Sequence, residues 1–213
     1  LLISDMHRFD KNFRGSYHFS PNEEEIEKYF EAIADIPTET PTLLRPYHAI
    51  QGSLFGTAIG DAIGLPYEGM SPRRIKKLKA FPLRQRFFFG RGMLSDDTEH
   101  TCMVADSLIY SQGAADKFAK LLACTMRLWF LGMPAGIGMA TLRACLKLWL
   151  FIPPKNSGVF SAGNGPAMRS AIIGVYASDD KALRAELVQI STRITHTDPK
   201  ALKGAMIVAE MAA

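Results

Sequence analysis

The chain has 213 residues, of which 47% are hydrophobic and 22% charged, and its formal net charge is +4. This length corresponds to a single domain with a buried core, and the hydrophobic content excludes a disordered or collagen-like chain. No uncharged apolar run reaches the roughly 18 residues of a membrane-spanning helix, because Arg127, Arg143 and Lys147 interrupt the most apolar stretch. We therefore expect a soluble globular protein without a membrane partner.

Charged residues are segregated along the chain. Residues 71–91 contain eight basic side chains and no acidic one, whereas residues 21–39 contain seven acidic side chains and one lysine. The first stretch predicts contact with a phosphate-rich ligand and the second with a basic partner. A solvated loop and a solvated helix face are the alternatives. Since the net charge is only mildly basic, we expect no nucleic-acid partner.

The cysteines bear on the compartment of the protein, and the two chain ends bear on whether the sequence is complete. Cys102, Cys124 and Cys145 are odd in number and lie among apolar residues, which predicts reduced core thiols in a reducing compartment, the cytoplasm. No secretory signal pattern opens the chain. The sequence starts at Leu1 rather than Met and stops within an apolar helical pattern. We expect it to be part of a longer polypeptide.

The spacing of apolar residues predicts an all-α, multi-helix bundle. An acidic amphipathic helix over residues 21–36 and a proline-broken linker make residues 1–46 an N-terminal extension, and residues 47–213 form the main domain. Further helices are predicted over residues 47–63, 95–110, 115–131, 137–150, 166–177, 179–194 and 199–213. Ser178 is the predicted N-cap of the helix that follows it. Only the short runs 87–89 and 159–160 suggest strand.

The first chemical motif is a helix with a glycine at every fourth position. Gly52, Gly56, Gly60 and Gly64 share one helix face, and each costs about 1 kcal/mol relative to alanine. The pattern predicts that another backbone approaches this face closely, either for tight packing alone or as part of a site. Asp61 at the helix end and Glu68 in the following turn are site candidates or ordinary polar turn residues.

The second motif opens a helix with two adjacent carboxylates. Ser95, Asp96 and Asp97 offer the hydroxyl and carboxylate oxygens that Mg²⁺ prefers. The alternative is helix capping and interaction with the helix dipole, for which the same residue types are favoured.

The third motif is a glycine-rich loop entering a helix at Ser161, Gly163, Asn164 and Gly165. Exposed N–H groups in such a loop can bind phosphate or sugar oxygens, although the same residues also suit an ordinary turn. His196 precedes the last predicted helix and is either a ligand-binding residue or a structural one.

Taken in order, these motifs resemble the ADP-ribosylglycohydrolase family. They read G-x-x-x-G-x-x-x-G-D-A-x-G-x-P-x-E, S-D-D-T-x-x-T, S-x-G-N-G-x-A-M-R and T-H, and the resemblance covers residues 47–213. The family includes the dinitrogenase-reductase-activating glycohydrolase and the ADP-ribosyl-acceptor hydrolases. The resemblance implies an all-α fold, a binuclear Mg²⁺ (or Mn²⁺) centre, and hydrolysis of the bond between ADP-ribose and a protein side chain, most often arginine.

The resemblance also assigns roles residue by residue. It places Ser95, Asp96 and Asp97 on the metals, with Asp97 and the acidic Glu68 as catalytic residues. The residues that it implies for holding ADP-ribose are Asp61, which would shape the pocket floor, and Ser161, Gly163, Asn164, Gly165 and His196.

One departure from the family pattern concerns the metal centre. The family completes its site with a second acidic cluster from a late helix, and no such cluster follows His196. Either a C-terminal portion is missing or the site is incomplete, and the unfinished last helix favours a missing portion. We expect this chain alone to hold Mg²⁺ poorly.

Two functions are compatible with these patterns. The first is an enzyme that removes ADP-ribose from a modified protein substrate. The second follows from family members that act as immunity proteins: a binding protein whose acidic N-terminal arm occludes an ADP-ribosyltransferase toxin, with or without hydrolysis. Replacing Asp96 and Asp97 distinguishes the two functions, because it should abolish the release of ADP-ribose by an enzyme and leave the binding of a toxin intact.

Overall fold

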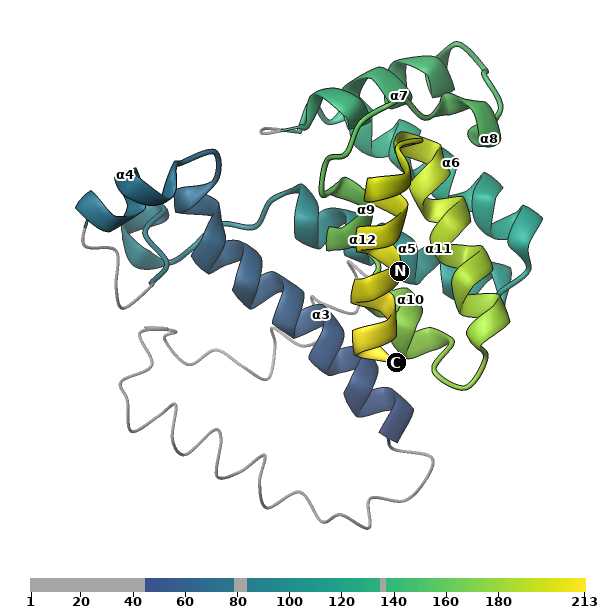
Figure 1. Cartoon of the computed structure of the whole chain (residues 1–213), viewed down its shortest axis with the longest axis horizontal. Coiled ribbons are helices and arrows are strands. Elements are labelled where there is room, and N and C mark those ends of the chain that lie inside the picture. The colour runs from purple at the N-terminus through teal and green to yellow at the C-terminus, as the bar shows by residue number, and fades with distance from the viewer. Residues whose placement is uncertain (1–44, 79–83, 135–136) are drawn as a thin grey trace.

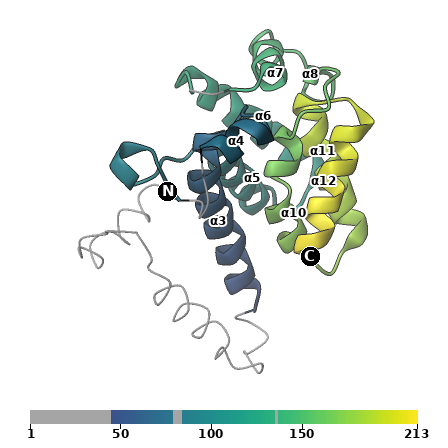
Figure 2. The ribbon, with the colours of Figure 1, turned by 60° about the vertical axis from the view of Figure 1, so that its left-hand side comes forward.

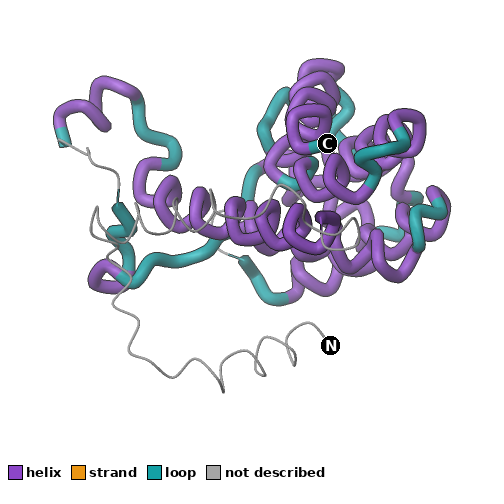
Figure 3. Tube along the Cα trace, turned by 90° about the horizontal axis from the view of Figure 1, so that it is seen from below, coloured by secondary structure: helices purple, strands orange, loops and turns teal. Residues whose placement is uncertain are grey.

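The structure is a computed structural model that describes residues 45–78, 84–134 and 137–213. Within these ranges it is all-α, with no strand and one isolated parallel bridge between Val159 and His196 (Figures 1 and 3). The predicted acidic helix over residues 21–36 lies outside the described residues. None of the helices in the described ranges combines the length and apolar character that crossing a bilayer requires.

The helices in chain order are α3 Arg45–Gly64, α4 Pro72–Lys77, α5 Asp96–Ser111, α6 Ala115–Leu131, α7 Met139–Trp149, α8 Pro154–Ser157, α9 Gly165–Met168, α10 Ala171–Tyr176, α11 Lys181–Thr195 and α12 Pro199–Ala212. Short 3₁₀ turns occupy Leu65–Tyr67 (η1) and Phe88–Gly90 (η2). Six of the seven main-domain helices predicted from the sequence are confirmed, with ends within about two residues of the prediction, the usual uncertainty of a helix boundary.

The core lies where α5, α6, α11 and α12 present their apolar faces to one another. Phe118, Leu122 and Met126 of α6 meet Leu187 and Val188 of α11, and all are essentially inaccessible to solvent. Helix α3 lies along one side of this bundle, against α5 and α10 (Figures 1 and 2). Its C-terminal end therefore meets the N-terminal end of α5.

The predicted helix over residues 166–177 is wrong in one respect, because two short helices, α9 and α10, occupy it. The chain bends at Arg169 and Ser170. The Arg169 side chain is fully buried and donates hydrogen bonds to α11, and the Ser170 hydroxyl donates to the Pro166 carbonyl at 2.6 Å. These tertiary and local hydrogen bonds override the helical spacing.

Several smaller predictions are also corrected. Helix α11 is capped by Asp180, whose carboxylate accepts the Leu183 N–H at 2.9 Å, and not by Ser178. Residues 87–89 do not form a strand: Phe88 and Phe89 belong to the 3₁₀ turn η2, in which Phe89 has a positive φ of 57°. The basic stretch contains the unpredicted helix α4.

The three cysteines are free, as expected, but they are not all core residues. Cys145 is buried, whereas Cys102 and Cys124 are exposed. The apolar neighbours of Cys102 and Cys124 in the sequence lie on other faces of their helices, so sequence context alone misplaced these two thiols.

Among the residues that the structure describes, no backbone approaches the glycines of α3 in the way that their spacing predicts. Within the described ranges, no heavy atom beyond the helix and the adjoining residues lies within 4 Å of a Cβ built at Gly52, Gly56, Gly60 or Gly64. Close backbone approaches occur instead at Gly158 and at Gly174 of α10, where a Cβ would overlap the carbonyl of Ala209 in α12.

Candidate functional site

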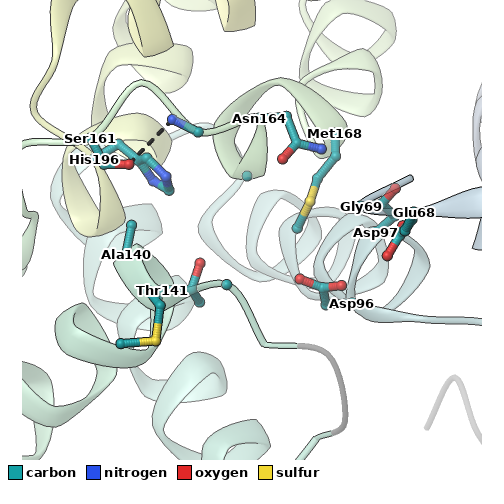
Figure 4. A pocket seen from close by; sticks show the side chains of 14 residues that line it. Glu68, Gly69, Asp96, Asp97, Ala140, Thr141, Ser161, Asn164, Met168 and His196 are labelled. Carbon is teal, nitrogen blue, oxygen red and sulfur yellow. Dashed lines mark hydrogen bonds between the residues drawn. The ribbon is translucent and has the colours of Figure 1, made fainter. Parts of the chain in front are cut away.

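A cavity of about 400 Å³ opens between the loops at one end of the bundle. Its walls come from the turn after α3, the first turn of α5, the first turn of α7, the loop before α9 and the residue that ends α11 (Figure 4). It is lined by Glu68, Gly69, Asp96, Asp97, Gly138, Met139, Ala140, Thr141, Ser161, Gly163, Asn164, Gly165, Met168 and His196. The structure therefore brings eight of the ten predicted site residues to one cavity.

Three carboxylates form one end of the cavity: Glu68, Asp96 and Asp97 (Figure 4). Partial burial raises the pKa of each carboxyl, and repulsion from neighbouring carboxylates raises it further. The pKa of Asp97 rises to about 6. These groups repel one another in their ionised forms, so this end of the cavity favours a cation.

Asp61 and Ser95 lie beneath this end rather than on its wall. The buried Asp61 carboxylate accepts the Ser95 N–H at 2.7 Å, the Ser95 hydroxyl at 2.8 Å and the Thr98 hydroxyl at 2.6 Å. These hydrogen bonds fasten the C-terminal end of α3 to the first turn of α5, and charge-assisted bonds of this kind are strong. Asp61 thus supports Asp96 and Asp97 from below, and the Ser95 hydroxyl proton is already donated to Asp61.

The opposite end of the cavity is built around His196. The bridge between Val159 and His196 holds the incoming loop against it, with the Thr197 N–H donating to the Val159 carbonyl at 3.0 Å. A Cβ at Gly163 would lie 2.9 Å from His196 Nε2, and one at Gly165 would lie 3.0 Å from Cε1. Glycine at both positions lets the loop lie directly on the imidazole, because a larger residue would force the ring to shift.

The Ser161 hydroxyl stabilises the same loop. It accepts the Gly163 N–H at 3.3 Å, as the dashed line in Figure 4 shows. Ser161 and Asn164 both line the cavity. The glycine-rich motif therefore serves as a wall of the cavity as well as a turn.

Sequence reasoning missed the first turn of α7. Gly138, Met139, Ala140 and Thr141 line the cavity, Gly138 provides no side-chain cap, and the first turn has no acidic residue. The uncapped N–H groups of a helix start attract anions. The only sequence signal was the pair of glycines, Gly136 and Gly138, ahead of a helix.

The carboxylate end of the cavity offers the type of ligand atom that suits a Mg²⁺ ion. Glu68, Asp96 and Asp97 present only carboxylate oxygens, which Mg²⁺ prefers, and a cation would relieve their mutual repulsion. The described ranges contain no group of three or more His, Cys, Asp or Glu side chains placed to hold a metal ion. Glu68, Asp96 and Asp97 alone therefore do not make up a complete set of metal ligands.

Protonation of His196 is expected to make stability depend on pH. Burial and the nearby Arg169 guanidinium lower the pKa of His196 from 6.5 to about 4. Between these values His196 binds a proton in the unfolded chain and not in the folded chain, so the contribution of His196 to stability is full above about pH 6.5 and falls as the pH drops towards 4. The loss reaches up to roughly 3 kcal/mol.

The measurement is the free energy of unfolding by denaturant between pH 7.5 and 4.5, for the wild type and for His196→Gln. The variant should lose less stability on acidification. Identical pH profiles for wild type and His196→Gln would contradict the assignment.

Comparisons with known proteins agree with the motifs. A protein-family model described as ADP-ribosylglycohydrolase matches residues 42–213. An uncharacterized protein of Archaeoglobus fulgidus is 33% identical over 162 residues, covering 73% of this chain and 52% of that protein. The uncharacterized protein YegU of Escherichia coli is 28% identical over 179 residues, covering 75% of this chain and 52% of that protein. The chain spans about half the length of these curated relatives, and it belongs to the ADP-ribosylglycohydrolase family.

Proposed function

We propose that this chain binds ADP-ribose in the cavity and supplies the first carboxylate cluster of a Mg²⁺-dependent hydrolase that removes ADP-ribose from modified protein side chains, with arginine as the acceptor. The observation that carries the proposal is the polarity of the cavity. Carboxylates form one end, and the glycine loop, His196 and the start of α7 form the other. A ligand with a pyrophosphate at one end and a reacting ribose at the other matches this arrangement.

The end formed by α7 and the glycine loop suits the anionic part of the ligand. Uncapped N–H groups at Met139 and Ala140 favour phosphate oxygens. The carboxylates repel phosphate, so the ligand is oriented with its ribose and glycosidic bond towards Glu68, Asp96 and Asp97. This orientation brings the bond to be broken to the acidic groups.

Hydrolysis breaks the bond between the anomeric carbon of the ribose and the side-chain nitrogen. The water oxygen bonds to that carbon, and one water proton reaches the leaving nitrogen. We assign this proton transfer to Glu68, because its carboxyl lines the cavity. Asp96 and Asp97 would hold Mg²⁺, which when bound orients ribose hydroxyls and stabilises negative charge. Asp61 keeps both aspartates in position through its hydrogen bonds to Ser95 and Thr98.

The decisive experiment measures free ADP-ribose released from an arginine-ADP-ribosylated protein, with Mg²⁺, with Mn²⁺ and with a chelator. Residues 1–213 and the complete reading frame that encodes them are assayed side by side. Metal-dependent release by the complete reading frame is expected. Absence of release by a folded protein from arginine-, serine- and cysteine-linked ADP-ribose alike would overturn the hydrolase proposal.

A further inference from the structure

Behind the cavity, a fully buried arginine connects two histidines. Arg169 is 0% exposed, and within the described ranges no carboxylate forms an ion pair with it. Its guanidinium donates instead to neutral acceptors: Ser191 Oγ at 3.0 Å, the Ser191 carbonyl at 2.8 Å, Thr195 Oγ1 at 2.7 Å and His100 Nδ1 at 3.1 Å. Burial lowers its pKa to about 10, so it is still protonated at neutral pH.

The Thr195 hydroxyl connects this arginine to the cavity. Thr195 is 0% exposed, and its Oγ1 has two partners: Arg169 Nη2 at 2.7 Å and His196 Nδ1 at 2.9 Å. A guanidinium can only donate, so Thr195 Oγ1 accepts from Arg169. The hydroxyl proton of Thr195 is then free to be donated to His196 Nδ1.

Counting donors decides which nitrogen of His196 carries the proton. If Nδ1 were protonated, Thr195 Oγ1 would accept twice and its own buried proton would have no acceptor, at a cost of about 1–3 kcal/mol. If Nδ1 is unprotonated, it accepts the Thr195 proton, and the buried hydroxyl group has an acceptor. The neutral imidazole then carries its proton on Nε2, at the edge of the ring next to Gly163 and the cavity.

We propose that Arg169 and Thr195 are positioning residues that fix His196 as the neutral Nε2–H tautomer, so that its imidazole presents one N–H donor, Nε2–H, to an oxygen of the bound ligand. The tautomer follows from the hydrogen bonds alone. The identity of the ligand, with a phosphate or sugar oxygen of ADP-ribose as the acceptor, rests on the proposed function.

The same arginine fixes the second histidine and thereby supplies an internal control. Arg169 Nη1 donates to His100 Nδ1 at 3.1 Å, so His100 must also be unprotonated at Nδ1. Thr195 does not contact His100. Loss of the Thr195 hydroxyl should therefore change the tautomer of His196 and leave that of His100 as it is.

Nitrogen chemical shifts of the two imidazoles, in protein carrying ¹⁵N-histidine, test the tautomer directly. In the wild type, Nε2 should be protonated and Nδ1 unprotonated in both histidines. Thr195→Val should shift His196 towards a mixture of tautomers, and Thr195→Ser, which keeps the hydroxyl, should restore the wild-type shifts. A proton on Nδ1 of His196 in the wild type, or unchanged shifts in folded Thr195→Val, would overturn the proposal.

Thr192 provides a matched control on the same helix. Its hydroxyl is also buried, but it has no hydrogen-bond partner in the structure. Thr192→Val makes the same change of atoms as Thr195→Val one helical turn earlier. It should leave the imidazole shifts of both histidines unchanged, so a change equal to that of Thr195→Val would contradict a specific role for Thr195.

Binding of free ADP-ribose, measured by calorimetry on the same proteins, tests the ligand. We expect Thr195→Val to weaken binding about tenfold, with Thr195→Ser and Thr192→Val at wild-type affinity. If the tautomer is as proposed but the wild type binds no ADP-ribose, the proposed function fails while the tautomer assignment stands. If ADP-ribose binds and the tautomer is the other one, the positioning role fails alone.

Discussion

Replacing Asp96 and Asp97 together by asparagine should lower metal-dependent ADP-ribose release by roughly a hundredfold or more. The two carboxylates are the cavity's oxygen donors on the first turn of α5, and asparagine keeps their shape while removing the charge that attracts Mg²⁺. Release is measured with the complete reading frame at saturating Mg²⁺.

Two control measurements show whether the loss of activity is specific to these two carboxylates and whether the variant is still folded. Asp106→Asn, on the same helix but outside the cavity lining, should retain activity. The double variant should be at least as stable as the wild type, because repulsion and burial raise the pKa of both carboxyls and their charges therefore oppose folding. Full activity in the double variant would show that these aspartates take no part in the reaction. If the double variant were unfolded, the claim that repulsion between the carboxylates opposes folding would be wrong.

Gly174→Ala should lower the free energy of unfolding by about 3 kcal/mol or more. A methyl group at this position would overlap the Ala209 carbonyl, so α10 and α12 would have to separate. Since a domain of this size is stable by only about 5–15 kcal/mol, the loss should be plain in denaturant unfolding.

Gly204 of α12 is the matched control for this substitution. A Cβ built there has nothing within 4 Å, and alanine is a better helix former by about 1 kcal/mol. Gly204→Ala should therefore be neutral or stabilising. If Gly174→Ala were as stable as Gly204→Ala, the close packing of α10 on α12 would be refuted.

The sequence predicted the helices well because a helix depends on local spacing. The apolar positions of α5, α6 and α11 repeat at helical intervals, and their bounds follow from that period. The break between α9 and α10 could not be predicted in this way. It depends on Arg169 reaching residues of α11 more than twenty positions later in the chain.

The sequence predicted which residues belong to the candidate site, but not which of them line the cavity and which lie beneath it. The motifs identified Asp61, Ser95 and Asp97 alike as site residues, yet only Asp97 lines the cavity, while Asp61 and Ser95 bond to each other beneath it. Residues in one motif are close in sequence, but their depth relative to a cavity depends on where the helices cross. The first turn of α7 was missed because backbone N–H groups carry no signature in the side-chain sequence.

The glycines show most clearly which features follow from the sequence and which depend on how the helices pack. The all-α class, the membership of the family through the order of its motifs, and the helix that carries Gly52, Gly56 and Gly60 could all be predicted from the residues alone. The packing of the helices determined where an added side chain would collide with another segment: it would do so at Gly174, which no motif marked, whereas the regular glycine series of α3 meets no other segment among the described residues. The physical reason is that a helix follows from the spacing of residues along the chain, whereas close packing depends on which backbone lies opposite, and residues distant in the sequence determine that.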